Sequence, residues 1–265
     1  MKHIIALLLI FCCTTAKAQF AHPWQGKRIA YIGDSVTDPR MKKGDMKHYW
    51  AWLQEWLQST PLVYAVSGHT FENGLQSLDR LHHEHGQEVD LLVVFLGTND
   101  FNADLPLGEF YHIQKDSVER AKGEMRRKVE RTRRTLVMSR ETVKGRINLF
   151  LQKARELYPT RQLVLLTPMH RGRAVFGDRN VQPDESYANE CGYYIHDVAD
   201  ALREAGQIWS VPVIDLFGLS GLTPQTAGQH GFFFDAETDL LHPNGAGHER
   251  MARILLQQSL ALPVF

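Results

Sequence analysis

Short apolar runs alternate with longer polar or amphipathic stretches along most of this 265-residue chain. Five runs are rich in Val, Ile and Leu and show little polar alternation: 28–32, 62–66, 90–96, 162–167 and 211–216. Strands that are covered on both faces have this pattern, because neither face of such a strand meets water. The chain therefore predicts five buried strands.

Stretches with a helical pattern lie between and after these runs. They cover 48–58, 74–85, the long polar segment 117–158, 187–210 and 247–262. Strands that alternate with helices form right-handed crossovers, which give a parallel sheet between two helical layers. We therefore expect an α/β fold, a three-layer α/β/α sandwich with a five-stranded parallel sheet, formed as one domain by residues 19–265.

Polar clusters follow the predicted strands at their carboxyl ends. They are Gly33-Asp34-Ser35, Ser67-Gly68-His69-Thr70, Gly97-Thr98-Asn99-Asp100, the loop 167–173, and the loop 239–245 before the last predicted helix. The carboxyl ends of parallel strands meet at one edge of the sheet, and ligands bind there. We therefore expect these clusters to share one site.

Ser35 is the candidate nucleophile of this site. A serine hydroxyl is a weak nucleophile at neutral pH, so acyl transfer needs a histidine to take its proton and a third group to orient that histidine. Asp239 and His242, three residues apart on one loop, suit these two roles. Gly-Asp-Ser alone is also an ordinary turn sequence. The nucleophile hypothesis therefore rests on the partners and not on the tripeptide.

The same reaction places negative charge on the carbonyl oxygen of the substrate, and that charge needs hydrogen-bond donors fixed in advance. The predicted donors are the backbone N–H groups of Ser35 and Gly68 and the side-chain amide of Asn99. Glycine at position 68 lets the backbone come close to a substrate, because it has no Cβ. These residues form the predicted oxyanion hole.

Four of these blocks, in this order, resemble the SGNH (GDSL-type) hydrolase family of esterases and lipases. The matching residues are Gly33-Asp34-Ser35, Gly68, Gly97-Thr98-Asn99-Asp100 and Asp239-Leu240-Leu241-His242. The residues after the serine, Val36-Thr37-Asp38, fit the pattern of the family only loosely. The resemblance implies a flavodoxin-like fold, ester hydrolysis through an acyl-serine intermediate, and neither a metal nor an organic cofactor.

The sequence gives less evidence for a function of five further residues. His170, Arg171 and Arg173 follow the fourth predicted strand at the same edge, so they are candidate substrate contacts, although loop arginines are commonly just solvated. Asp100 is expected either to support Asn99 or to cap a helix. Cys191 is expected to be a small buried residue.

The segment 101–146 is longer than a compact member of the resembled family needs, and it is rich in Lys and Arg. We expect a basic helical insertion here, a solvated helix or helical hairpin with mixed charges. The alternative is a cap over the site that attracts an anionic substrate or surface.

The first 18 residues predict a signal peptide. A positive start at Lys2 precedes the apolar run 4–13 and the small residues Ala16 and Ala18. The protein is therefore expected to be exported and to be periplasmic or secreted. A lipoprotein is a weaker interpretation, because a bulky residue precedes both Cys12 and Cys13. No later run is long enough to span a membrane.

Composition narrows the function further. The 30 basic and 30 acidic residues balance, which gives no global sign of nucleic-acid binding. Removal of the signal peptide leaves one of three cysteines, so no disulfide within the mature chain is expected. The oligomeric state is left open.

We expect a serine esterase that acts on a small-molecule or glycan ester, and specifically a carbohydrate O-acetyl esterase. A short acyl group is favoured because no anchor or long apolar segment indicates a lipid interface. A lipase or lysophospholipase that cleaves longer acyl chains is the main alternative. A non-catalytic carbohydrate-binding protein with the same fold is another, but it would not need both Asp239 and His242.

Overall fold

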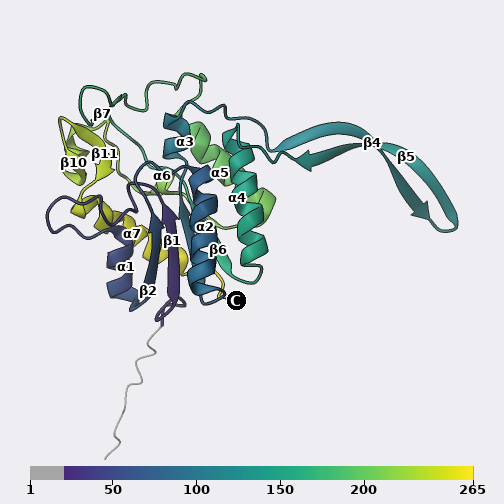
Figure 1. Ribbon diagram of the computed structural model, residues 1–265, viewed down its shortest axis with the longest axis horizontal. Coiled ribbons are helices and arrows are strands. Elements are labelled where there is room, and N and C mark those ends of the chain that lie inside the picture. Colours follow the sequence, from purple (N-terminus) through teal and green to yellow (C-terminus); the bar gives the residue numbers. More distant parts are fainter. Residues whose placement is uncertain (1–20, 265) are drawn as a thin grey trace, which may run out of the picture.

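The computed structural model describes residues 21–264, so the predicted signal peptide lies outside the described residues. A five-stranded parallel sheet in the order β2-β1-β3-β6-β9 forms the centre of the fold (Figure 1). The bounds of its strands are Arg28–Gly33 for β1, Thr60–Ala65 for β2, Leu91–Phe95 for β3, Gln162–Leu166 for β6 and Val213–Ile214 for β9. This order is that of flavodoxin-like folds, and it confirms the predicted five-stranded α/β architecture.

The two faces of the sheet carry separate apolar cores, because side chains alternate along each strand. Ala30, Ile32, Leu92 and Val94 pack into one core, and Ile29, Tyr31, Leu91 and Val93 pack into the other. The neighbouring inner strands β3 and β6 are buried along their whole length. Pro61 is tolerated because β2 is an edge strand.

Five long helices cover the two faces and complete the three layers (Figure 1). Helices α1 (Tyr49–Leu57) and α7 (Gly245–Ser259) pack on one face. Helices α2 (Phe71–His85), α4 (Val143–Leu157) and α5 (Ile195–Trp209) pack on the other. The helix predicted over 74–85 begins at Phe71, because Thr70 is its N-cap and donates its backbone N–H to Asn73 Oδ1 at 3.0 Å.

The predicted helical insertion is wrong in its secondary structure. Most of the basic segment 101–146 is an antiparallel hairpin of two 12-residue strands, β4 (Tyr111–Lys122) and β5 (Met125–Leu136), which projects from the body (Figure 1). Gly123 has a φ of 62° and opens a two-residue turn, as hairpin turns require. Cross-strand pairing stabilises this segment, and its charged composition does not reveal such pairing.

A second, antiparallel sheet lies beside the main one and carries part of the candidate site. Its strands, in the order β10-β11-β7-β8, have the bounds Phe233–Asp235, Asp239–Pro243, Ala174–Val175 and Val181–Gln182. The short helices are α3 (Thr98–Asn102), α6 (Leu216–Leu219) and the 3₁₀ helix η1 (Ala227–Phe232). Within residues 21–264, no helix has both the length and the apolar character to cross a bilayer.

Candidate active site

Ser35 lies in a tight turn directly after β1. The backbone N–H groups of Thr37 and Asp38 donate to the Asp34 carbonyl at 3.0 and 2.9 Å, and the Val36 N–H donates to Asp34 Oδ1 at 3.1 Å. A Cβ at Gly33 would lie 2.3 Å from Thr37 Oγ1, so this turn excludes any larger residue there. The tripeptide thus forms a turn that also holds the serine at the sheet edge.

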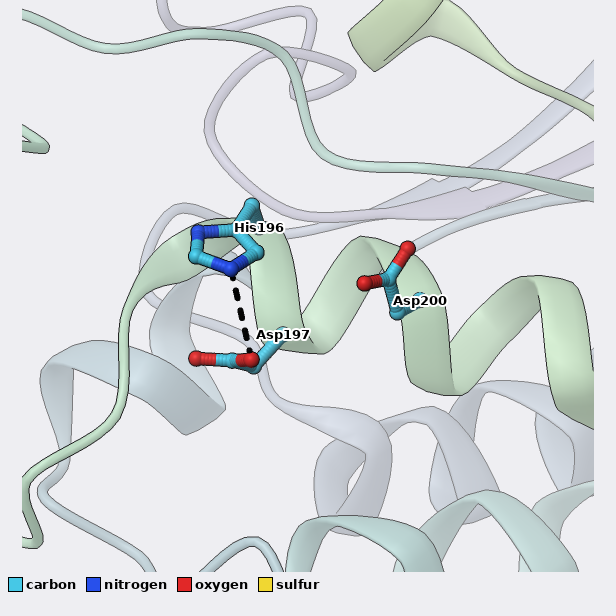
Figure 2. Close-up of side chains that lie close together, drawn as sticks. All are labelled: His196, Asp197 and Asp200. Carbon is cyan, nitrogen blue, oxygen red and sulfur yellow. Dashed lines mark ion pairs between the residues drawn. The ribbon is translucent and has the colours of Figure 1, made fainter.

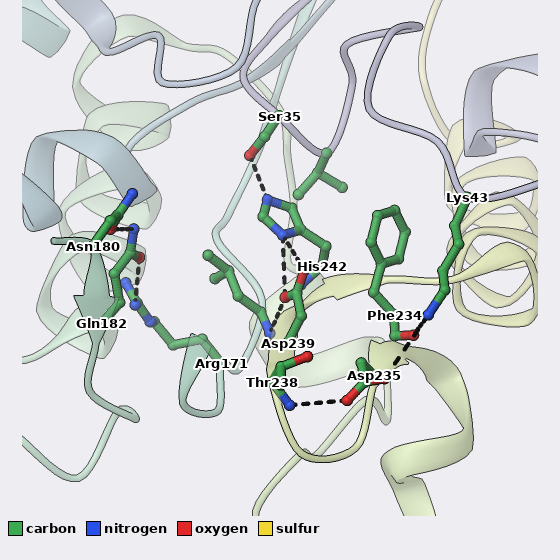
Figure 3. A network of polar contacts seen from close by, with 12 residues as sticks. Ser35, Lys43, Arg171, Asn180, Gln182, Phe234, Asp235, Thr238, Asp239 and His242 are labelled. Carbon is green, nitrogen blue, oxygen red and sulfur yellow. Dashed lines mark hydrogen bonds and ion pairs between the residues drawn. The ribbon is translucent and has the colours of Figure 1, made fainter. Parts of the chain in front are cut away.

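His242 reaches Ser35 from β11, 207 residues later in the chain. Its Nε2 atom lies 2.9 Å from Ser35 Oγ, and its Nδ1 atom lies 2.9 Å from Asp239 Oδ2 (Figure 3). Asp239 Oδ1 also accepts the backbone N–H groups of Leu241 and His242. The Asp239 carboxylate is therefore fixed by its own strand before it orients the imidazole.

Two aromatic rings flank the imidazole, and no local pattern in the sequence indicated either of them. The ring centroids of Phe176 and Phe234 lie 5.4 and 5.6 Å from that of His242. Phe234 is on β10, next to β11, whereas Phe176 directly follows β7. Pairing of β11 with both strands brings the two rings to the histidine, and only the folded sheet decides this placement.

Asn99, in α3, lies close to Ser35. Both residues line one small cavity. Its lining residues are Asp34, Ser35, Val36, Phe95, Thr98, Asn99, Met169, His170 and Leu241. The Asn99 amide donates to the His69 carbonyl at 3.0 Å and, more weakly, to Asp34 Oδ2 at 3.4 Å. Burial raises the pKa of Asp34 to about 7, although the Val36 N–H and His242 oppose the shift.

Gly68 lies in the loop after β2 with a φ of 85°. It does not line the cavity beside Ser35, but its neighbour His69 accepts the Asn99 amide through its carbonyl. No atom lies within 4 Å of the position that a Cβ would occupy at Gly68, so this side of the loop is open. The assignment of its N–H to the oxyanion hole stays a prediction.

Of the two roles expected for Asp100, the structure supports helix capping, although the helix is α2 and not α3, on which Asp100 lies. Its Oδ2 atom accepts the backbone N–H of Phe71, the first residue of α2, at 3.0 Å, and its Oδ1 atom lies 3.2 Å from Arg146 Nη1. Burial raises the pKa of this fully buried carboxyl to about 6, against the Phe71 hydrogen bond and the Arg146 charge. Asp100 thus caps α2 rather than its own helix.

Of the three candidate substrate contacts, the structure brings only His170 to the cavity beside Ser35. Its Nδ1 atom lies 2.7 Å from Glu185 Oε1, and its ring packs on Phe217. The side chain of Arg171 is buried and donates to Gln182 Oε1 at 2.8 Å (Figure 3). It also donates to Asn102 Oδ1. Burial lowers its pKa to about 10.

Arg173 is exposed and directly precedes β7. Its carbonyl accepts the Leu240 N–H at 3.1 Å, so its backbone joins the loop to β11. Neither Arg171 nor Arg173 lines the cavity beside Ser35. Their position after β6 is as expected, but the direction of a side chain is set by packing around it and not by its place in the sequence.

The expectation of a buried Cys191 is wrong, because this cysteine is exposed. It lies in the turn between Asn189 and Tyr193, where its thiol donates to the Asp104 carbonyl at 3.0 Å. Its backbone N–H donates to Asn189 Oδ1. The predicted helix over 187–210 begins only at Ile195, which leaves this cysteine in a surface loop.

Within residues 21–264, one group of side chains has the spacing of a metal site. His196, Asp197 and Asp200 lie at the start of α5 with their ligand atoms within 4.8 Å of one another (Figure 2). Asp197 Oδ2 already accepts the Tyr194 N–H at 2.7 Å, and Asp200 pairs with Arg203. Helix capping and a surface ion pair account for this cluster.

Comparison with known proteins agrees with this geometry. The sequence profile of the GDSL-like Lipase/Acylhydrolase family matches residues 31–250. Among solved structures, a possible lipase from Chitinophaga pinensis is 21% identical with a TM-score of 0.66, and the match covers 88% of this chain and 97% of that one. Among curated protein sequences, none matches significantly.

Two further solved structures share the fold. The lipase/acylhydrolase from Enterococcus faecalis is 19% identical with a TM-score of 0.53, over 90% of this chain and 98% of that one. An acetyl xylan esterase from Geobacillus stearothermophilus is 16% identical with a TM-score of 0.51, over 91% and 97%. At these identities the likeness concerns the fold.

Proposed function

Because this chain belongs to the GDSL-like lipase/acylhydrolase family of carboxylic ester hydrolases, we propose that Ser35, His242 and Asp239 are its catalytic triad. The observation that carries the proposal is the pair of 2.9 Å contacts that joins Ser35 Oγ to His242 Nε2 and His242 Nδ1 to Asp239 Oδ2. When Asp239 accepts a hydrogen bond from the Nδ1–H group of His242, Nε2 is free to accept one from the serine hydroxyl.

The reaction then follows from this arrangement. His242 takes the Ser35 proton as Oγ attacks the ester carbonyl, and the resulting imidazolium is stabilised by Asp239. His242 gives that proton to the leaving alcohol when the tetrahedral intermediate collapses to the acyl-serine. A water molecule, deprotonated by His242, attacks the acyl group, and the acid leaves as Ser35 regains its proton.

The oxyanion of both tetrahedral intermediates needs donors close to Ser35. We assign this role to the backbone N–H groups of Ser35 and Gly68 and to the Asn99 amide. Asn99 supports the assignment best, because it lines the same cavity as Ser35 and its amide is held by the His69 carbonyl. Such preorganised donors contribute about 3–4 kcal/mol each to transition-state stabilisation in comparable enzymes.

The small cavity beside Ser35 favours a short acyl group. The cavity has a volume of ≈ 20 Å³, and Val36, Phe95, Met169 and Leu241 contribute apolar side chains to its lining. This is about the room that a single water-sized group needs. We therefore propose an acetyl ester as substrate, with a carbohydrate as the alcohol; the fold shared with an acetyl xylan esterase is consistent with that choice.

Hydrolysis of p-nitrophenyl esters of graded chain length tests this proposal. Turnover should be fastest with the acetyl ester and fall as the chain lengthens, because longer chains exceed the cavity. Ser35→Ala should lower kcat by about 10⁴-fold or more. A preference for long chains would favour a lipase or lysophospholipase, and full activity of Ser35→Ala would exclude the serine mechanism.

Export is part of the proposal and rests on the sequence of residues 1–18. Expression of the full chain in a bacterial host, followed by N-terminal sequencing of the mature protein, tests it. The mature protein should begin near Gln19. An intact N-terminus on protein recovered from the cytoplasm would contradict export.

A further inference from the structure

The hairpin of β4 and β5, residues 111–136, is here called the arm. Each strand has 12 residues, so at about 3.3 Å per residue the arm is about 40 Å long. It projects clear of the three-layer body (Figure 1). None of its residues lines the cavity beside Ser35. Isolated two-stranded ribbons are marginally stable in water. The arm therefore adds little to the stability of the fold, and a binding role would account for its presence.

The base of the arm is firmly attached to the body. Buried Asn148, in α4, donates from one amide nitrogen to the carbonyls of Phe110 and Val137, at 3.1 and 3.0 Å. These two residues directly precede and follow the arm. Trp209 Nε1 donates to the Asn148 oxygen at 2.9 Å. The arm thus leaves the body from a fixed root.

The arm has a charge opposite to that of the rest of the chain. It carries 9 of the 30 basic residues but only 4 of the 30 acidic ones, which leaves 21 basic against 26 acidic residues elsewhere. The register places alternate residues on two faces. We call one of them the even face, after the numbering of its residues in β4. It consists of the even-numbered residues 112–122 of β4 and the residues of β5 opposite them, which are the odd-numbered residues 125–135. The odd face carries the remaining residues of both strands.

Two of the four cations on the odd face form ion pairs within the arm. Lys115 lies 3.7 Å from Glu130, and Arg126 lies 3.5 Å from Glu119. The Arg134 guanidinium lies over the Tyr111 ring. Lys128, on the same face, has no ion pair among the described residues. The odd face thus has four cations against two carboxylates, whereas the even face has five cations against one carboxylate.

The even face is different, because most of its cations have no carboxylate partner. Arg133 pairs with Asp116 at 2.7 Å, but among the described residues no ion pair forms to Arg120, Lys122, Arg127 or Arg131. Arg120 lies directly opposite Arg127, and like charges in opposed positions destabilise a strand pair. An anion between these two arginines would reverse that repulsion.

Apolar side chains lie among these cations. Val118 is opposite Val129, and Met125 at the tip is opposite Lys122. Val118 and Met125 are 49% and 68% exposed. Cations interleaved with exposed apolar side chains match the interface of an anionic bilayer, where phosphate groups lie above acyl chains. An acidic polymer would use the cations and leave the apolar side chains without a partner.

We propose that the even face of the arm docks on an anionic phospholipid bilayer. The acidic body does not oppose such docking, because the arm is long. At physiological salt the Debye length is about 8 Å, so the tip of the arm lies several Debye lengths from the body. The body is then hardly repelled by the membrane that the tip contacts. This proposal does not depend on the ester substrate, and its test does not use hydrolysis.

Flotation with vesicles of phosphatidylglycerol and phosphatidylcholine in equal parts tests the proposal. The even-face variant carries Arg120→Gln, Lys122→Gln and Arg127→Gln. The matched odd-face variant carries Lys115→Gln, Arg126→Gln and Lys128→Gln, and loses the same charge from the same hairpin. The wild type should bind these vesicles but not pure phosphatidylcholine. The even-face variant should bind about a hundredfold more weakly, and the odd-face variant less than about tenfold.

Circular dichroism of each variant establishes that its body is folded before binding is compared. Met125→Ser should also weaken vesicle binding while binding to polygalacturonate stays the same. Equal losses in the two triple variants, or no vesicle binding by the wild type, would overturn the proposal. It would also be overturned by tighter binding to polygalacturonate than to vesicles, or by a dimer in sedimentation velocity that the even-face variant abolishes.

Discussion

At the scale of single residues, the candidate site depends on hydrogen bonds that fix a side chain before substrate arrives. Asp239 accepts two backbone N–H groups of its own strand in addition to the imidazole. Asn99 is held by the His69 carbonyl. Polar groups that are already oriented need no reorganisation during the reaction, and this is the main source of electrostatic catalysis.

Replacement of Asn99 by Ala tests the oxyanion assignment. Loss of one preorganised donor should lower kcat by about 10²–10³-fold and change KM little, because the bond is made chiefly in the transition state. Steady-state kinetics with p-nitrophenyl acetate measure both constants.

Asn102→Ala is a suitable control for this experiment. It lies on the same short helix, but its side chain contacts Arg171 and Gln182 and not the cavity beside Ser35. A near-normal kcat for Asn99→Ala, or an equal loss in Asn102→Ala, would show that Asn99 is not an oxyanion donor.

At the scale of secondary-structure elements, the arm and the body meet through α4. Asn148 is fully buried and satisfies two backbone carbonyls at the root of the arm and the indole N–H of Trp209. Side-chain amides that satisfy several buried groups fix one geometry, because the alternatives leave polar groups unpaired.

Asn148→Ala should therefore destabilise the protein by about 1–3 kcal/mol, the cost of leaving buried polar groups without partners. Urea unfolding measures this free energy. Amide hydrogen exchange should also increase at the root of the arm, around Phe110 and Val137.

The matched control is Gln152→Ala on the exposed side of α4, where the side-chain amide donates to Glu156 Oε1 at 2.9 Å. This substitution should change the free energy of unfolding by less than about 0.5 kcal/mol. A stability of Asn148→Ala equal to that of the wild type would mean that the root of the arm is held by other contacts.

At the scale of the whole molecule, the layer formed by α1 and α7 contains a buried histidine that makes stability depend on pH. His248 accepts the Tyr49 N–H at 3.2 Å and lies against the rings of Tyr49 and His48. Burial lowers the pKa of His248 well below its usual value, and the charges of His48 and His242 add to the effect. The folded protein therefore keeps this imidazole neutral.

The sign of the pH effect follows from that lowered pKa. In the unfolded chain His248 takes up a proton below about pH 6.5, whereas in the folded protein it does not. The stabilisation is present above this pH and is lost as the pH falls, by about 1.4 kcal/mol per pH unit. When the pH falls from about 7.5 to about 5.5, the free energy of unfolding should therefore decrease less for His248→Gln than for the wild type.

Urea unfolding of both proteins at the two pH values measures the difference. Asp34 and Asp100, whose pKa values are raised to about 7 and about 6, oppose the effect of His248 in this range, so the comparison with the variant is required to isolate it. Equal losses in the wild type and His248→Gln would contradict a neutral buried imidazole.

The sequence by itself determined the α/β architecture and the edge of the sheet at which the candidate site lies. Buried strands such as β1 and β3 are apolar on both faces, so a short run of apolar residues is enough to recognise each of them in the sequence. The carboxyl ends of parallel strands share one edge. The order of strands and loops along the chain therefore predicted that Ser35 and Asn99 lie at the same edge of the sheet.

Only the tertiary structure decided how side chains far apart in the chain meet. The arm is a ribbon because its two strands pair with each other, and the mixed charges of that segment do not encode this pairing. Arg171 turns away from Ser35 because Asn102 and Gln182 bind it, and Phe176 reaches His242 through the pairing of β7 with β11. Contacts of this kind depend on long-range packing, which no local pattern contains.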